Sequence, residues 1–122
     1  MVALEKAGKE SSDEYGEILQ RELYTRYICR LNPWPEGLQH SFAVANGIIY
    51  NQMQGPNEFV ITGNLKSWDR WADLHRITVP TLVMGARHDE MNPQSVEREA
   101  TLIPGTRFFM SETGSHLAMW DD

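Results

Sequence analysis

The stretch Thr78-Val79-Pro80-Thr81-Leu82-Val83-Met84-Gly85 decides the fold class of this sequence. It is a short apolar run with a proline near its start and a glycine at its end, which is typical of a strand buried on both faces of a parallel sheet. Residues 93–103 predict a helix, Pro104-Gly105-Thr106 ends it, and Arg107-Phe108-Phe109-Met110 predicts a second strand. The order strand, loop, helix, turn, strand indicates a parallel βαβ unit and therefore an α/β fold.

The residues before this unit are mostly helical in pattern. Apolar side chains recur at helical spacing over residues 13–31, directly after the candidate caps Ser11-Ser12-Asp13. The segment Asn32-Pro33-Trp34-Pro35 ends this helix, because a proline disfavours helical geometry in the residue before it.

The remaining elements are shorter. We expect a helix over residues 36–50 and a strand-like piece over residues 59–62. We also expect a helix over residues 65–74, with Trp68 and Trp71 on one face. The change of pattern near residue 78 predicts two regions. Residues 1–77 form a helical region, and residues 78–122 carry the βαβ unit.

Two polar loops follow the predicted strands, at the edge of a parallel sheet where active sites form. The first loop contains Asp89 and the second contains His116. A carboxylate that accepts the Nδ1 proton of a histidine fixes its tautomer and stabilises the imidazolium that forms when the histidine deprotonates a serine. The order Asp then His is that of the α/β-hydrolase triad. On spacing alone, an equally good interpretation is that Asp89 caps the following helix and His116 is an ordinary loop residue.

Composition excludes several partners. The chain has 122 residues, and 11 Lys+Arg against 17 Asp+Glu give a net charge of −6, without the basic cluster that a nucleic acid requires. No apolar run approaches the roughly 20 residues of a membrane span. The single Cys29 lies in an apolar stretch, which favours a buried structural thiol and fits a reducing cytoplasm. The four histidines lack metal-ligand spacing, so we expect neither a metal nor a cofactor.

Several segments resemble the proline iminopeptidases, which are α/β-hydrolase serine peptidases. The strand and acid loop (residues 80–90) and the histidine loop Gly114-Ser115-His116-Leu117-Ala118-Met119-Trp120-Asp121-Asp122 are similar to the superfamily as a whole. The segments that resemble this family in particular are Cys29-Arg30-Leu31-Asn32-Pro33-Trp34-Pro35, Tyr50-Asn51-Gln52-Met53-Gln54-Gly55-Pro56-Asn57-Glu58-Phe59 and Thr62-Gly63-Asn64-Leu65-Lys66-Ser67-Trp68-Asp69. The resemblance covers residues 13–122 and implies a helical cap (1–77) followed by the C-terminal part of an α/β-hydrolase core (78–122).

The resemblance also implies roles for individual residues. Asp89 is the triad acid and His116 the general base, while Glu58 and Glu90 bind the free amino terminus of a peptide or amino-acid amide. The alternatives are a solvated loop acid for Glu58 and a carboxylate at a helix N-terminus for Glu90. Phe59 and Trp68 are candidates for an apolar pocket around a proline ring, although aromatic residues more often simply pack helices.

One departure from the family concerns the nucleophile. The sequence contains no G-x-S-x-G elbow, so the relay and the amino-terminus anchor are expected in a part of a larger enzyme whose serine lies elsewhere. We expect the missing N-terminal half or a second copy of the chain as a partner, and we expect the isolated chain to be inactive and poorly folded. Two alternatives remain open. One is another α/β-hydrolase (an amidase, esterase or epoxide hydrolase), and the other is a non-catalytic binding module derived from a hydrolase.

Overall fold

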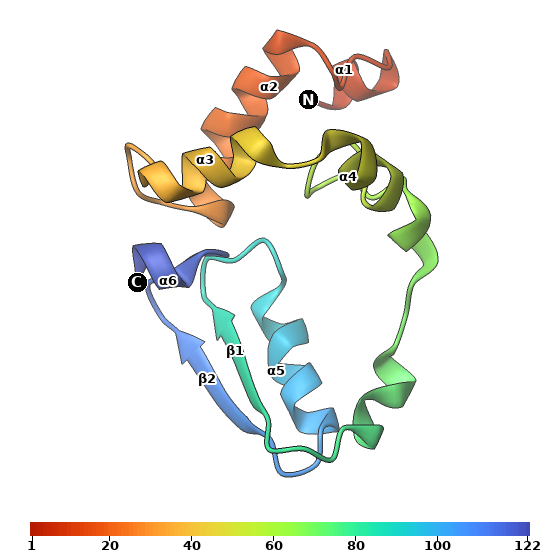
Figure 1. Cartoon of the computed structure of the whole chain (residues 1–122), viewed down its shortest axis with the longest axis vertical. Coiled ribbons are helices and arrows are strands. Elements are labelled where there is room, and N and C mark those ends of the chain that lie inside the picture. The colour runs from red at the N-terminus through yellow and green to blue at the C-terminus, as the bar shows by residue number, and fades with distance from the viewer. The chain divides into compact units, whose positions relative to one another are not determined.

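The computed structural model describes all residues, Met1–Asp122, and they form two compact units (Figure 1). The first unit comprises Met1–Thr25 and Asn32–Trp68, and the second comprises Arg26–Leu31 and Asp69–Asp122. The units thus divide after Trp68, earlier in the chain than the boundary after residue 77 expected from the sequence. The reason is that the helix η3 (Trp71–Arg76) contacts a helix of the second unit. The assignment of residues 1–77 as a functional cap stays a prediction.

The first unit begins with α1 (Val2–Lys6) and α2 (Asp13–Leu19). The Ser12 hydroxyl caps α2 by accepting a hydrogen bond from the Tyr15 main-chain nitrogen at 3.3 Å. The helix continues as the π-helical segment η1 (Gln20–Ile28), so the helix predicted from residue 13 is confirmed as far as Ile28. Its core side chains, Tyr15 and Leu19, are buried.

The helix predicted over residues 36–50 is wrong as a single element. The structure has α3 (Glu36–Val44) and α4 (Gly47–Met53), separated by Ala45 in an extended conformation. The Asn46 side chain accepts a hydrogen bond from the Ile49 main-chain nitrogen at 3.1 Å and so begins a new helix. An asparagine followed by a glycine favours this break over continuation, because its short side chain competes for main-chain donors.

The next two predictions also fail. Residues 59–62 form no strand, only an isolated bridge between Asn57 and Val60. The helix predicted over residues 65–74 is replaced by two short 3-10 turns, η2 (Asn64–Ser67) and η3. Asp69 interrupts them by accepting a hydrogen bond from the Trp71 main-chain nitrogen at 2.9 Å. Trp68 and Trp71 therefore do not share a helix face.

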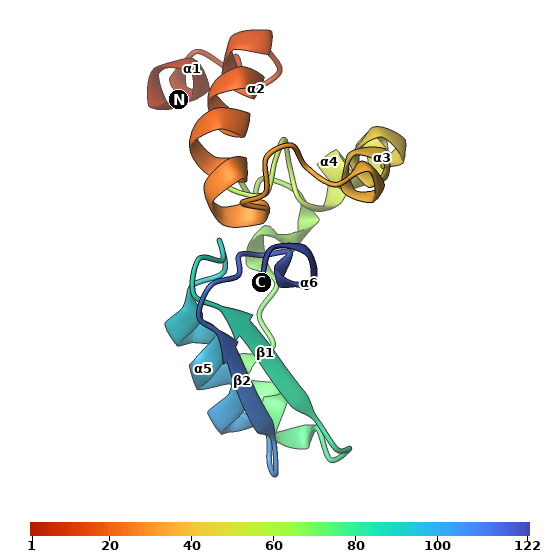
Figure 2. The ribbon, with the colours of Figure 1, turned by 90° about the vertical axis from the view of Figure 1, so that its left-hand side faces the viewer.

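The second unit is the predicted βαβ arrangement. The strands β1 (Leu82–Ala86) and β2 (Arg107–Ser111) are parallel, with Leu82 opposite Arg107 and Ala86 opposite Ser111. The crossover helix α5 (Pro93–Leu102) packs on one face of the sheet, and its Val96 is buried (Figure 2). The short helix α6 (Ala118–Asp121) ends the unit.

The prediction that the first strand is buried on both faces is wrong for this chain. Leu82 is 54% exposed and Met84 is 61% exposed, because α5 covers only the opposite face of this two-stranded sheet. Phe109, which pairs with Met84 in the register, is exposed as well. No helix of the chain has the length and apolar content needed to cross a lipid bilayer.

Candidate active site

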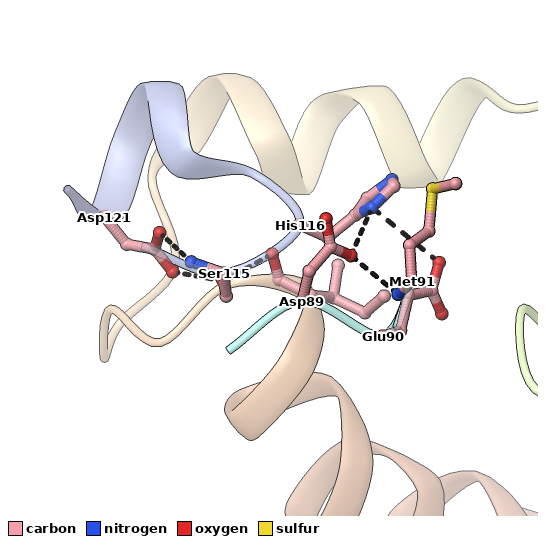
Figure 3. A network of polar contacts seen from close by, with 7 residues as sticks. Asp89, Glu90, Met91, Ser115, His116 and Asp121 are labelled. Carbon is pink, nitrogen blue, oxygen red and sulfur yellow. Dashed lines mark hydrogen bonds and ion pairs between the residues drawn. The ribbon is translucent and has the colours of Figure 1, made fainter. Parts of the chain in front are cut away.

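Asp89 and His116 meet at the end of the sheet, as predicted (Figure 3). The His116 Nδ1 and Asp89 Oδ1 atoms are 3.0 Å apart, a hydrogen-bond distance, although the residues are 27 positions apart in sequence. The Asp89 side chain is 10% exposed and that of His116 is 37% exposed. A nearly buried carboxylate thus lies within hydrogen-bond distance of Nδ1, an arrangement that fixes the tautomer of a histidine.

The two loops that carry this pair are fixed to each other by main-chain hydrogen bonds. Beyond the Ala86–Ser111 pair, the nitrogen of Arg87 donates to the oxygen of Ser111 at 2.8 Å, and the nitrogen of His88 donates to the oxygen of Gly114 at 3.1 Å. The Arg87 guanidinium also forms a two-pronged ion pair with Glu112, and this hydrogen bonding holds the pKa of the Glu112 carboxyl below its usual value. The strand register therefore continues into the loops and sets the spacing of the pair.

The alternative interpretation, in which Asp89 caps the following helix, is wrong. The cap of α5 is Asn92, whose side-chain oxygen accepts hydrogen bonds from the main-chain nitrogens of Gln94 and Ser95 at 2.9 and 3.4 Å. Asp89 Oδ1 instead accepts a hydrogen bond from the Met91 main-chain nitrogen at 2.9 Å, within its own loop. This local bond orients the Asp89 carboxylate toward His116.

The turn before His116 is held by two residues, Ser115 and Asp121, to which the sequence analysis assigned no individual role. Ser115 is fully buried, and its hydroxyl lies 2.9 Å from the Ile28 main-chain oxygen and also contacts the Asp121 carboxylate, so that two acceptors share its one proton (Figure 3). Asp121 further accepts hydrogen bonds from the main-chain nitrogens of Ser115 and Arg30, at 2.9 and 2.7 Å. No motif or spacing signals these contacts, because they join residues as many as 91 positions apart.

The same contacts change the ionisation of Asp121. Partial burial by itself would raise the pKa of the Asp121 carboxyl, but the hydrogen bonds from Ser115 and Arg30 outweigh this effect and lower it. An ionised Asp121 therefore stabilises the turn that presents His116. The same turn is also held through its main chain, because the nitrogens of His116 and Leu117 donate to the oxygens of Tyr27 and Ile28, both at 2.9 Å.

Glu90 lies beside the same imidazole. Its Oε1 atom is 3.8 Å from the His116 Nδ1 atom, and its side chain is 13% exposed. A hollow of about 400 Å³ adjoins this end of the sheet and is lined by Asp89 and His116 together with the apolar side chains of Met84, Phe109 and Met119. This part of the second unit thus combines an imidazole, two carboxylates and an apolar wall.

Glu58 belongs to a different cavity, within the first unit. The Tyr24 hydroxyl donates to Glu58 Oε2 at 2.6 Å. Both residues line a hollow of about 400 Å³ together with Phe42, Tyr50 and Pro56, among others. Glu58 is half-buried, so its carboxylate is not a freely solvated loop acid.

The two candidate pocket aromatics differ in their surroundings. Phe59 packs on the ring of Tyr24, with ring centres 6.0 Å apart, and so supports the wall behind Glu58. Trp68 is 68% exposed and lines neither hollow. The aromatic residues at the first hollow are Tyr24, Phe42 and Tyr50, which the sequence did not suggest as pocket residues.

Two other kinds of reactive site, a cysteine nucleophile and a metal site, can be compared with the structure. Burial raises the pKa of the Cys29 thiol, which is the opposite of what a thiolate nucleophile needs. No three His, Cys, Asp or Glu side chains converge as ligands for a metal ion.

Known proteins resemble the chain in both sequence and structure, although no family model matches it. The proline iminopeptidase of Flavobacterium johnsoniae is 47% identical over 88% of this chain and 36% of its own length. That of Elizabethkingia meningoseptica is 39% identical over 98% of this chain and 41% of its own length. The chain therefore spans about two fifths of the length of these curated relatives.

Two solved structures agree with this result. The crystal structure of VinJ superimposes with a TM-score of 0.86 and 36% identity, over 95% of this chain and 40% of that one. The proline iminopeptidase of Mycobacterium smegmatis gives a TM-score of 0.79 and 33% identity, over 93% of this chain and 38% of that one. These matches confirm the predicted fold, the C-terminal part of an α/β-hydrolase. Over the residues that it spans, the chain belongs to the proline iminopeptidase family of α/β-hydrolases.

Proposed function

We propose that the chain is the part of a serine aminopeptidase that carries the relay acid, the general base and the residues that bind the substrate's amino terminus. The enzyme releases an N-terminal proline, or another small residue, from peptides or amino-acid amides. The observation that carries this proposal is the 3.0 Å contact between His116 Nδ1 and the nearly buried Asp89 carboxylate. The similarity to proline iminopeptidases supports the choice of substrate.

In the proposed reaction, His116 moves the proton and Asp89 holds His116. A serine outside this sequence attacks the peptide carbonyl, and Nε2 of His116 takes the hydroxyl proton as the new C–O bond forms. The C–N bond then breaks as His116 returns this proton to the leaving amine. Water hydrolyses the acyl-enzyme by the same proton path. The nucleophile is supplied by the N-terminal half of the enzyme.

Glu58 and Glu90 each serve, in this proposal, as acceptors for the protonated amino or imino group of the substrate. A carboxylate in a partly buried site forms a strong, charge-assisted hydrogen bond with a cationic amine. A substrate with a blocked amino terminus would offer these carboxylates no charged donor, and the loss of that interaction costs binding energy. The aromatic wall beside Glu58 favours an apolar first residue such as proline.

We further propose a cytoplasmic location for the enzyme. The single cysteine, Cys29, is fully buried and cannot form a disulfide within the chain. A reducing compartment suits such a thiol.

The test uses a chimera in which this chain replaces the segment that it matches in the Flavobacterium johnsoniae relative, so that a nucleophilic serine is present. We expect the chimera to hydrolyse prolyl-p-nitroanilide and to reject the N-acetylated form. Glu58→Gln should raise KM for the free-amine substrate, with kcat retained.

Other results would contradict the proposal in distinguishable ways. Equal turnover of the free and blocked substrates would favour another amidase or esterase. A folded chimera without any turnover would favour the non-catalytic binding module. If Glu58→Gln left KM unchanged, the assignment of Glu58 as an anchor would be wrong even in an active aminopeptidase.

A further inference from the structure

Tyr24 makes a short contact with Glu58 within the first unit. The distance from its hydroxyl oxygen to Glu58 Oε2 is 2.6 Å, which is typical of a hydroxyl that donates to a carboxylate. The two residues are 34 positions apart in sequence, so this contact is produced by the fold and not by a local turn. Both side chains line the same hollow of about 400 Å³.

The ring of Tyr24 is itself held in place. It stacks with Trp34 at a centroid distance of 6.1 Å, meets Phe42 edge-on at 6.0 Å and packs against Phe59 at 6.0 Å. A ring in contact with three aromatic neighbours has little freedom to rotate. The hydroxyl at its edge is therefore a fixed donor.

The loop of Glu58 is held from its other side as well. The fully buried Asn57 accepts a hydrogen bond from the Phe59 main-chain nitrogen at 2.9 Å and donates one to the Tyr15 hydroxyl at 3.3 Å. The backbone of Glu58 is thus fixed between two anchored residues. The freedom left to Glu58 is that of its side-chain torsions, which the Tyr24 hydroxyl limits.

We infer that Tyr24 is a positioning residue for Glu58: it binds Oε2 and leaves Oε1 to accept a hydrogen bond from the substrate's cationic amino group in the adjoining hollow. This inference rests on the proposed function of Glu58 as an anchor. Without the hydroxyl, the glutamate has more conformations to lose when a ligand binds, and the affinity falls. The chemistry of the acyl transfer is unaffected, because Tyr24 acts only through Glu58.

The variant Tyr24→Phe, made in the chimera, tests this inference. It keeps the ring in its aromatic cluster and removes only the hydroxyl. For prolyl-p-nitroanilide we expect KM to rise roughly tenfold, the size of effect expected for one hydrogen bond to a charged group, with kcat within about twofold. Hydrolysis of p-nitrophenyl acetate, which has no amine, should not change.

A double-mutant cycle separates positioning from a purely structural role. In the Glu58→Gln background, Tyr24→Phe should have no further effect on kcat/KM. If Tyr24→Phe lowered kcat/KM as much in that background as it does in the parent, the inference would be overturned. An unchanged KM in Tyr24→Phe alone would also overturn it. If Glu58→Gln by itself leaves KM unchanged, the proposed anchor fails first. An effect of Glu58→Gln without an effect of Tyr24→Phe overturns only the role of Tyr24.

Discussion

The carboxylate of Asp121 accepts hydrogen bonds from both the main-chain nitrogen and the hydroxyl of Ser115, the residue that precedes His116. The candidate base therefore depends on an acidic side chain that is not part of the proposed relay. Ser115 is fully buried, so loss of this acceptor would leave its main-chain nitrogen without the hydrogen bond that it makes to Asp121.

The first prediction concerns the effect of pH on the stability that Asp121 provides. Because the folded-state pKa of Asp121 lies below its ordinary value of 3.8, its ionised form stabilises the folded state above that pH. This contribution should disappear as the pH falls through the lowered pKa. In urea unfolding of the chimera, the parent should exceed Asp121→Asn in stability by about 1–3 kcal/mol at neutral pH. The difference should shrink below pH 4, and a difference that does not depend on pH would contradict this account.

The second prediction concerns the relay. Asp89→Asn retains the shape of the side chain but no longer accepts the Nδ1 proton as a carboxylate does, which favours the wrong tautomer of His116. We expect kcat for prolyl-p-nitroanilide to fall by about 10³–10⁴-fold in the chimera, with little change in KM. The neighbouring His88→Asn variant is the matched control and should keep most of its activity, since His88 is exposed and contacts the second loop through its main chain. A similar loss in both variants would indicate general damage to the loop.

Gly114 gives the third prediction. A Cβ atom at this position would lie 2.7 Å from Ser111 Oγ and 2.8 Å from the Ala118 Cβ atom. Gly114→Ala should therefore displace the histidine turn and destabilise the chimera by about 1–3 kcal/mol in urea unfolding. Gly16→Ala is the control, because a Cβ atom there meets nothing within 4 Å and a helical alanine is favoured over glycine. Equal stabilities of the two variants would show that the turn accommodates the methyl group.

The fourth prediction concerns the exposed sheet face of the 122-residue chain by itself. Leu82, Met84 and Phe109 are exposed together on a two-stranded parallel sheet, an arrangement that favours pairing with other chains. Sedimentation at micromolar concentration should show self-association. The variant Met84→Glu/Phe109→Glu should reduce the association. A monomeric parent chain with a cooperative thermal transition would contradict the prediction.

Local sequence patterns predicted the parts of the site that depend on the sheet. Asp89 and His116 follow strands whose apolar runs are continuous, and parallel strands end at the same edge. The helix over residues 36–50 was predicted incorrectly because the capping tendency of Asn46 outweighed the apolar spacing. The contact between Tyr24 and Glu58 and the contacts of Ser115 with Ile28 and Asp121 could not be predicted. They are created by tertiary packing, and serine, tyrosine and aspartate are common at the surface in any sequence.

The register of β1 and β2 limits how the length of this segment can vary in evolution. A residue inserted in either strand would shift one loop along the other by about 3.3 Å and exchange the two faces of that strand. The distance between His116 Nδ1 and Asp89 Oδ1 would then exceed a hydrogen bond, whatever the inserted residue. Insertions and deletions should therefore be excluded from the strands and confined to the turn at Pro104-Gly105, where the chain reverses far from the relay.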